Sequence, residues 1–238
     1  MQSDKPQDRA KLAAGRKAID SYLRDGMRIG LGSGSTSHWF VRALGEKVRR
    51  DGFDVAGVPT SNATRDIARE VGVPLLDLND VDSLDLTIDG ADEIDRAGRM
   101  IKGGGACLLW EKMVAHASRR MIAVVDDSKV VDHLGAFPLP IEVIRFGWRS
   151  TRRELAKLLA EFGHADARIE LRGGEASPIQ TDSAHYILDC HLGRIDDPDH
   201  LAQHFNEIPG VVEHGLFVGI AHEIVVGHPD GTAEVIKL

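Results

Sequence analysis

Residues 27–50 read MRIGLGSGSTSHWFVRALGEKVRR and combine three patterns in one short stretch. The apolar residues of 27–31 predict a strand, and the glycines and serines after them predict a tight turn. Large apolar residues then recur at helical spacing, which predicts a helix with one buried face. That face consists of Trp39, Phe40, Ala43, Leu44 and Val48. A strand, a glycine-rich turn and a helix in this order form the first half of a βαβ unit.

The same order of elements continues on both sides of this stretch. Upstream, the apolar spacing predicts an amphipathic helix over roughly residues 7–24. Downstream, the predicted elements are strands at 53–60, 73–78, 84–90 and 121–127 and helices at 62–72 and 106–118. Ser61 or Asn62 supplies an N-cap for the helix at 62–72. Strands separated by helices predict a mainly parallel sheet that is covered on both faces.

The pattern changes near Pro138 and Pro140. The elements predicted beyond this point are helices at 150–162 and 198–207 and short strands at 167–172, 178–182 and 185–191. Residues 215–238 predict a hairpin that turns at Pro229-Asp230-Gly231 and returns to the main sheet. We therefore predict an α/β fold with a small inserted α+β domain. The boundaries we expect are 1–135 plus 209–238 for the main domain and 136–208 for the insertion.

Composition narrows the range of partners. The chain has 238 residues and a formal net charge of −8, which argues against binding to nucleic acid or to an anionic membrane. Its two cysteines, Cys107 and Cys190, do not form a CxxC motif and are expected as buried thiols in a reducing compartment. The charged N-terminal region lacks the apolar core of a signal peptide. We expect a cytoplasmic protein with no nucleic-acid partner and no membrane partner.

The first candidate ligand-binding segment is GLGSGSTS at residues 30–37. In a parallel sheet, ligands bind outside the carboxyl ends of the strands, where this segment is predicted to lie. Its glycines allow close backbone approach, the following helix N-terminus offers N–H groups, and Ser33, Ser35 and Thr36 add hydroxyl donors. These groups suit a phosphate, although the segment matches neither the Walker A motif nor GxGxxG. The alternative is an ordinary turn in which Ser35 caps the helix.

The second candidate segment is TIDGADEID at residues 87–95, which holds four carboxylates. Such a cluster is used to bind a divalent metal, accepts hydrogen bonds from sugar hydroxyls, or is a solvated acidic loop. The spacing is not that of an EF-hand, and histidines with zinc-ligand spacing are missing from the sequence. Asp89 and Asp92 flank a Gly-Ala turn that allows both to point inward, whereas Glu93 and Asp95 are expected farther out or at the surface.

The third candidate segment is KGGGACLLWEK at residues 102–112. In a helix that begins near residue 106, the neighbours of Glu111 three and four residues away are all apolar. Apolar surroundings favour the protonated carboxyl, which suits a general acid/base that works near neutral pH. The alternatives are that Glu111 pairs with a lysine across the helix or points to solvent. Lys129, in VVDDSK at the end of another predicted strand, is placed to reach the same edge of the sheet.

Taken together, these segments resemble the ribose-5-phosphate isomerase A family. The resemblance rests on GLGSGST, PTSNAT, TIDGADEID, KGGGACLLWEK, VVDDSK, FPLPIEVI and IPGVVEHGLF, in the family's order and approximate spacing. It is weakest over residues 163–185. It implies a Rossmann-like domain with a small inserted α+β domain, assembled as a homodimer or homotetramer. It also implies interconversion of ribose 5-phosphate and ribulose 5-phosphate in the pentose phosphate pathway, without a metal or an organic cofactor.

The resemblance also implies roles for individual residues. Glu111 matches the catalytic base of the family, and Asp89, Asp92 and Lys102 match its sugar-binding and catalytic polar groups. The remaining substrate-binding residues implied are Lys11, Ser33, Gly34, Ser35, Thr36, Gly103, Gly104 and Lys129. The chain departs from the family in two places: Ser33 replaces a threonine, and Leu109-Trp110 replaces a Thr-Arg pair before the glutamate.

These residues suggest a mechanism in which Glu111 moves a proton between C2 and C1 through an enediolate. Lys102 and the N–H groups of residues 103–105 are candidates to stabilise the enediolate, and Asp89 or Asp92 is a candidate to assist ring opening. Two alternatives stay open on sequence grounds. One is another sugar-phosphate enzyme of the same fold, such as a deaminase–isomerase or a CoA-transferase. The other is a sugar-phosphate sensor without enzymatic activity.

Overall fold

The computed structural model describes residues 5–238, and the chain divides into two compact units. The first unit comprises the residues up to Ala91 together with Trp110–Val130 and Gly219–Leu238. The second comprises Asp92–Leu109 and Val131–Val218. None of the helices within 5–238 combines the length and the apolar character needed to cross a membrane.

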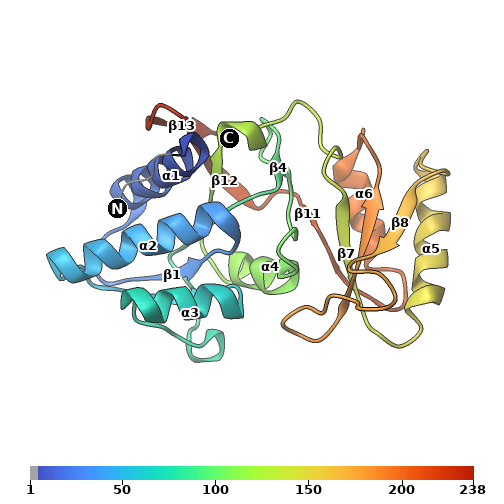
Figure 1. The fold of residues 1–238 in the computed structure, drawn as a ribbon, viewed down its shortest axis with the longest axis horizontal. Coiled ribbons are helices and arrows are strands. Elements are labelled where there is room, and N and C mark those ends of the chain that lie inside the picture. Colours follow the sequence, from blue (N-terminus) through green and yellow to red (C-terminus); the bar gives the residue numbers. More distant parts are fainter. Residues whose placement is uncertain (1–4) are drawn as a thin grey trace. The chain divides into compact units, whose positions relative to one another are not determined.

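The first unit is built on a six-stranded sheet in the order β13-β12-β6-β3-β1-β2. The strands are β1 Met27–Leu31, β2 Val55–Pro59, β3 Leu86–Asp89, β6 Met121–Asp126, β12 Ala221–Gly227 and β13 Ala233–Lys237. All neighbouring strands are parallel except β12 and β13, which form the hairpin expected at the end of the chain (Figure 1). The predicted α/β class and the mainly parallel sheet are therefore confirmed.

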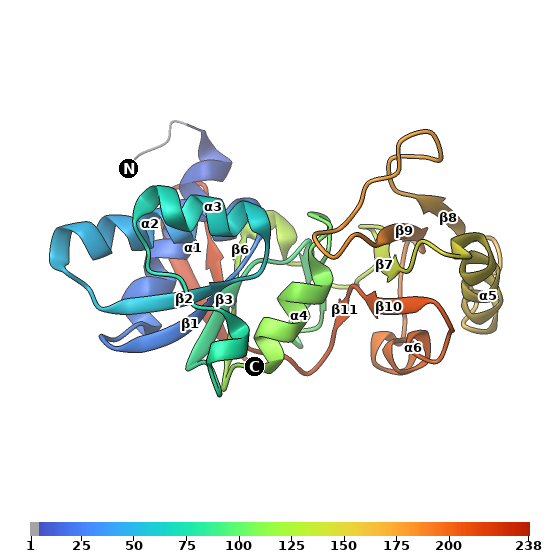
Figure 2. The ribbon, with the colours of Figure 1, turned by 90° about the horizontal axis from the view of Figure 1, so that it is seen from below.

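Helices cover both faces of this sheet. The helices of the first unit are α1 Pro6–Tyr22, α2 Gly34–Asp51, α3 Asn62–Val71 and α4 Leu108–His116, of which α4 starts in the second unit. Helices α1, α2 and α3 lie on one side of the strands (Figure 2), where Phe40 of α2 packs fully buried with Ile29 and Leu31 of β1. On the other side, Val114 of α4 packs with Val58 of β2.

The second unit contains two antiparallel sheets. One has the order β10-β7-β9-β8, and the other has the order β11-β5-β4. The four strands of the larger sheet are β7 Leu139–Val143, β8 Arg168–Leu171, β9 Tyr186–His191 and β10 Val211–His214. Those of the smaller sheet are β4 Glu93–Ile94, β5 Met100–Ile101 and β11 Leu216–Phe217. Helices α5 Trp148–Glu161 and α6 Pro198–Phe205 pack their apolar faces into a core shared with β7 and β9.

Two of the predicted strands are wrong. Residues 73–78 form a single bridge, between Leu75 and Gly57, before a short 3₁₀ helix η1 at Leu78–Asp80. Pro74 has no N–H to continue a ladder, which limits pairing here. Residues 178–182 likewise form one bridge, between Gln180 and Tyr186, because the chain turns back at Thr181–Ala184.

The two units differ from the predicted domain boundaries in one segment above all. Residues 92–109 were expected in the main domain, but they lie in the second unit. The cause is the small sheet, in which β5 pairs with β4 and with β11 and so joins this segment to the later part of the chain. The predicted insertion 136–208 lies wholly within the second unit. That the two units are separate folding domains stays a prediction.

Candidate active site

The carboxylate of Asp89, at the end of β3, organises the glycine loop between β1 and α2. Its Oδ1 atom accepts hydrogen bonds from Ser33 N at 2.9 Å, Gly90 N at 2.7 Å and Ser37 Oγ at 3.1 Å. Asp89 is fully buried. A Cβ on Gly32 would lie 2.2 Å from that same oxygen, so only glycine fits beside this carboxylate. On sequence grounds, the glycines of this loop were expected to let a ligand approach closely. Gly32 is in fact required by the structure of the loop itself.

The side chain of Ser33 belongs to a buried cluster of hydroxyl groups. Its Oγ lies 2.7 Å from Thr60 Oγ1, 2.7 Å from Ser61 Oγ and 3.0 Å from Thr64 Oγ1. The N-cap position of α2 is occupied by Ser33, and its side chain makes no capping bond. Ser35 lies inside the helix, so the alternative in which Ser35 caps this helix is wrong. Thr60, Ser61 and Thr64 belong to the PTSNAT segment, and sequence reasoning gave them no role in shaping the glycine loop.

The first turn of α2 carries the remaining residues of the proposed phosphate site. Gly34 and Ser35 are exposed, whereas Thr36 is buried. This turn contains no acidic side chain. Because the N-terminal end of a helix carries a partial positive charge and N–H groups without intrahelical partners, the turn suits an anion.

Two lysines follow the same edge of the sheet. Lys129 ends the 3₁₀ helix η2, Asp127–Lys129, directly after β6, and Asp126 caps η2 through Ser128 N at 3.2 Å. Lys11 follows Ala10 in α1. The backbone at Ala10 packs directly against Gly227, the last residue of β12, because a Cβ on Gly227 would lie 1.9 Å from the carbonyl oxygen of Ala10. In the sheet β12, β6, β3 and β1 are consecutive neighbours, so Lys11, Lys129, Asp89 and the glycine loop lie at the carboxyl ends of adjacent strands.

Glu111 lies in the first turn of α4 and is only 4% exposed. The alternative in which this carboxylate points to solvent is therefore wrong. Lys112, beside it in the sequence, is also buried. Trp110, which the family resemblance matches to an arginine, lines a cavity of about 520 Å³ together with Leu75 and Met113.

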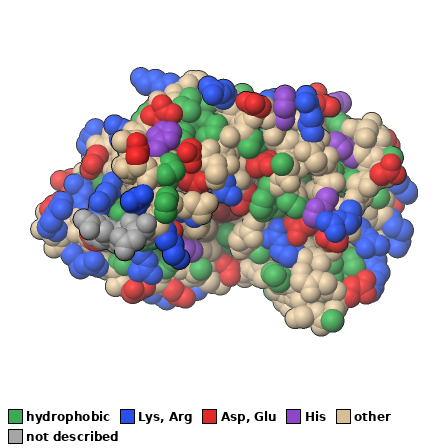
Figure 3. Space-filling view, turned by 45° about the horizontal axis from the view of Figure 1, so that its top comes forward, with side chains coloured by type: hydrophobic (Ala, Val, Ile, Leu, Met, Phe, Trp, Pro, Cys, Tyr) green, Lys and Arg blue, Asp and Glu red, His purple; other side chains and the backbone are tan. Residues whose placement is uncertain are grey.

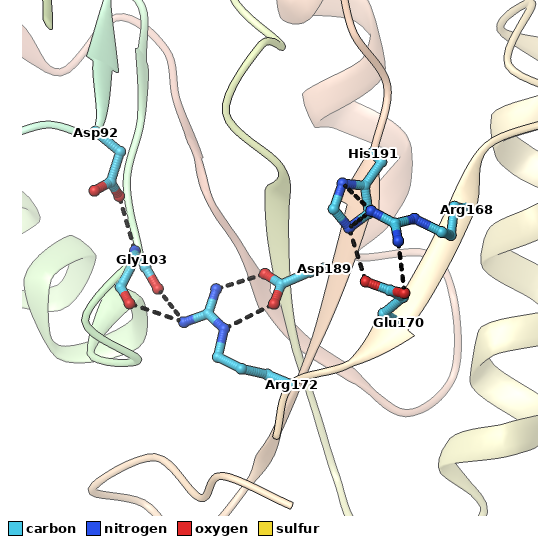
Figure 4. Close-up of polar contacts among 8 residues, drawn as sticks. Asp92, Gly103, Arg168, Glu170, Arg172, Asp189 and His191 are labelled. Carbon is cyan, nitrogen blue, oxygen red and sulfur yellow. Dashed lines mark hydrogen bonds and ion pairs between the residues drawn. The ribbon is translucent and has the colours of Figure 1, made fainter. Parts of the chain in front are cut away.

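The loop that precedes α4 is held in a conformation that only glycine adopts easily. Gly103 has a φ of +106°, and the helix begins only at Leu108, two residues later than predicted. Asp92 Oδ2 accepts a hydrogen bond from Gly104 N at 2.8 Å (Figure 4). Lys102 is buried, its N–H donates to Gly215 O at 2.9 Å, and its Nζ lies 5.5 Å from the ring centroid of Phe217.

The other two carboxylates of the acidic segment bind groups within the second unit. Glu93 is buried and accepts from the N–H groups of Gly135 at 2.7 Å and Phe137 at 2.6 Å. Asp95 is buried and accepts from Arg99 Nε at 2.6 Å. Glu93 and Asp95 were expected farther out or at the surface. The surface alternative is wrong, and so is the alternative of a solvated acidic loop. Within residues 5–238, no group of three or more His, Cys, Asp or Glu side chains is arranged to hold a metal ion.

The predicted site residues thus form two sets. The first unit holds Lys11, Ser33, Gly34, Ser35, Thr36, Asp89, Glu111 and Lys129, and the second holds Asp92, Lys102, Gly103 and Gly104. On the face shown in Figure 3, acidic and basic side chains are interspersed.

The parallel sheet of the first unit, with polar segments after its strands, defines a class of α/β proteins. Members of this class bind ligands outside the carboxyl ends of neighbouring parallel strands.

Comparison with known proteins defines this class further. The pattern of the family described as ribose 5-phosphate isomerase A (phosphoriboisomerase A) matches residues 56–231. Ribose-5-phosphate isomerase A of Cereibacter sphaeroides is 52% identical over 98% of this chain and 93% of its own length. Ribose-5-phosphate isomerase A 2 of Yersinia pseudotuberculosis is 51% identical over 96% of this chain and 97% of its own length. The chain belongs to the ribose 5-phosphate isomerase A family.

Solved structures agree with this assignment. A D-ribose-5-phosphate isomerase in complex with phospho-erythronic acid is 37% identical, with a TM-score of 0.89 over 99% of this chain and all of that chain. Ribose 5-phosphate isomerase from Plasmodium falciparum is 32% identical, with a TM-score of 0.90 over 97% of this chain and 99% of that chain.

His38 on α2 gives this region a pH-dependent stability. Burial, together with the nearby Arg42 guanidinium, holds the pKa of His38 below its ordinary value of 6.5. The unfolded chain therefore binds a proton at this residue before the folded chain does. Its contribution to stability is fully present above pH 6.5 and is lost as the pH falls from there toward the lower pKa of the folded state.

We expect His38→Gln to remove this dependence. Melting temperatures of the wild-type protein and the variant, compared at about pH 7.5 and about pH 5.5, should show the wild-type protein losing more stability in acid. An equal loss in both proteins would contradict the assignment.

Proposed function

We propose that this chain interconverts D-ribose 5-phosphate and D-ribulose 5-phosphate by proton transfer through an enediolate, with Glu111 as the general acid/base. The observation that carries the mechanism is the burial of Glu111 in the first turn of α4, directly after the KGGGA loop. A carboxylate at this position can take a proton from one carbon of the substrate and return it to the neighbouring carbon. One such group serves both half-reactions, because C1 and C2 of a planar enediolate are reached from the same face.

The phosphate of the substrate binds to the first turn of α2 in this proposal. The N–H groups and hydroxyls of Gly34, Ser35 and Thr36 supply donors, and Lys11 and Lys129 supply positive charge. Ser33 acts by shaping the loop, since Asp89 binds its N–H and three hydroxyls surround its side chain. Phosphate binding far from the reacting carbons provides energy that orients the sugar.

The sugar end of the substrate binds to Asp89, Asp92 and the loop that begins at Lys102. Lys102 and the backbone N–H groups of this loop stabilise the negative charge that develops on the enediolate oxygen. We propose that Asp89 or Asp92 accepts the proton of the anomeric hydroxyl when the sugar ring opens. We propose that the same groups bind phospho-erythronic acid, because its carboxylate and phosphate resemble the enediolate and phosphate of the reacting sugar.

The alternatives weighed on sequence grounds have less support. The relatives at 51% and 52% identity over nearly the whole chain carry the isomerase name, and the buried glutamate fits an isomerase better than a sensor. We further propose that the protein acts in the cytoplasm and assembles as a homodimer or homotetramer, as its family resemblance implies.

Replacing Glu111 with glutamine tests the proposed acid/base directly. Glutamine keeps the shape of the side chain but cannot accept and return the proton, so kcat should fall by about 10²–10⁴-fold while KM stays within about threefold. Steady-state kinetics with ribose 5-phosphate measure both parameters.

Glu142→Gln is a matched control for that variant. Glu142 is a fully buried carboxylate of the second unit, where its Oε1 bonds Thr181 Oγ1 at 2.8 Å and His185 Nδ1 at 2.9 Å. Its loss should lower the melting temperature and leave kcat nearly unchanged. A Glu111→Gln enzyme that turns over within about tenfold of the wild-type rate would refute the acid/base role.

The reaction should need no divalent metal. Glu93 and Asp95 of the acidic segment already bind backbone N–H groups and an arginine, so they are not arranged as metal ligands. Exhaustive dialysis against EDTA should leave kcat unchanged, as measured by formation of ribulose 5-phosphate. Loss of activity that Mg²⁺ restores would instead support the metal-binding interpretation of this segment.

A further inference from the structure

A single arginine outside the predicted site holds the KGGG loop. Arg172 follows directly after β8, and its Nη1 donates to Gly103 O at 2.8 Å and to Gly104 O at 3.1 Å (Figure 4). The contact joins residues 69 positions apart in the sequence. Arg172 lies in the stretch where the family resemblance is weakest, and nothing in the sequence marked it.

The guanidinium is itself fixed by a second, two-pronged contact. Arg172 Nε donates to Asp189 Oδ2 at 2.8 Å, and Arg172 Nη2 donates to Asp189 Oδ1 at 2.5 Å. The side chain of Arg172 is 14% exposed and that of Asp189 is 17% exposed. Asp189 belongs to β9, which is flanked by β7 and β8 in the four-stranded sheet. A paired arginine and carboxylate have one preferred planar geometry, so the sheet fixes the direction in which the remaining Nη1 donor points.

The contact determines how the glycine peptides are oriented. In a trans peptide the C=O and N–H bonds point in opposite directions. The Gly103–Gly104 peptide is therefore held on both sides, by Arg172 at its oxygen and by Asp92 at its N–H. The next peptide is held by Arg172 at Gly104 O, which directs the N–H of Gly105 away from the guanidinium.

A cation at the carbonyl oxygen also changes the strength of that N–H donor. A hydrogen bond to the oxygen polarises the whole peptide group, which makes its N–H a stronger donor. The charged guanidinium has a larger effect of this kind than a neutral donor. Since Asp92 already accepts from Gly104 N, the polarised N–H of Gly105 is the better placed of the two to meet a developing oxyanion.

We propose that Arg172, oriented by Asp189, is a positioning residue for the isomerisation. It holds the Gly103–Gly105 backbone so that the Gly105 N–H stabilises the enediolate oxygen. This inference rests on the proposed function, since it concerns a donor that is used mainly in the transition state. In this proposal Arg172 acts through its contacts with the loop, so its loss should affect kcat more than ground-state binding.

The test compares Arg172→Ala and Arg172→Lys with the wild-type enzyme. In Arg172→Ala the loop loses both contacts, and kcat should fall about 10–100-fold with little change in KM. Lysine keeps the charge and one donor but cannot pair in a fork with Asp189, so its kcat should lie between those of the wild-type enzyme and the alanine variant.

Binding measurements separate positioning from a general loss of structure. Phospho-erythronic acid, as a probe of the enediolate, should bind the alanine variant more weakly by about the factor lost in kcat/KM. Inorganic phosphate, which probes the first turn of α2, should bind all variants equally. Circular dichroism and melting curves show whether each variant is folded, and Asp189→Asn provides a second perturbation of the same contact without shortening the arginine.

Arg168→Ala is the matched control. Arg168 lies on β8, four residues before Arg172, and its own contacts are to Glu170 and His191 and not to the glycine loop (Figure 4). Its removal should leave kcat and both binding constants unchanged.

The outcomes distinguish this inference from the function on which it rests. A wild-type protein that does not isomerise ribose 5-phosphate would overturn the proposed function. An active wild-type enzyme whose folded Arg172→Ala variant keeps kcat within about threefold would overturn the role of Arg172 alone. So would an equal loss of affinity for phospho-erythronic acid and for inorganic phosphate.

Discussion

The arrangement of the first unit depends on one carboxylate oxygen. Asp89 Oδ1 binds Ser33 N, Gly90 N and Ser37 Oγ, and so fastens the glycine loop after β1 to the end of β3. Hydrogen bonds to an ionised acceptor are roughly twice as strong as those between neutral groups, and burial protects them from competition by water. The close contact excludes any side chain at residue 32. Glycine at residue 32 and aspartate at residue 89 are therefore a matched pair, and together they fix the loop that leads into the first turn of α2.

The same device recurs in the second unit, where carboxylates hold backbone N–H groups in place. Asp92 binds Gly104 N, and Glu93 binds the N–H groups of Gly135 and Phe137. This explains how the chain accommodates four carboxylates between residues 89 and 95, since each of them accepts hydrogen bonds from backbone N–H groups. It also explains the glycines before Glu111, which are poor helix formers but lie in a loop before α4 begins. A Cβ at Gly104 would lie 2.6 Å from Asp92 Oδ1, so the loop and the acidic turn require each other.

The sequence predicts the parts of the structure that depend on local pattern. The strand at residues 27–31, the helices and the terminal hairpin follow from apolar spacing and turn residues, and the family resemblance names the site residues. Contacts between distant residues leave no such pattern. The segments around Leu75 and Gln180 have the composition of strands, but each pairs with its neighbour through a single bridge. The contact of Arg172 with Gly103 depends on how β8 and β9 pair, which no local motif encodes. The burial of Glu93 is likewise visible only once β4 is paired.

The central claim is that one buried carboxylate transfers a proton between C1 and C2. Ribose 5-phosphate converted in D₂O, with the product analysed by NMR and mass spectrometry, tests this claim most directly. A proton held by Glu111 exchanges with solvent at least in part while the enediolate exists, so the account predicts deuterium at C1 of ribulose 5-phosphate. Over longer times deuterium should also appear at C2 of the remaining ribose 5-phosphate. Conversion to ribulose 5-phosphate with no deuterium on carbon would contradict the account, which requires that the transferred proton pass through a carboxyl group that exchanges with solvent.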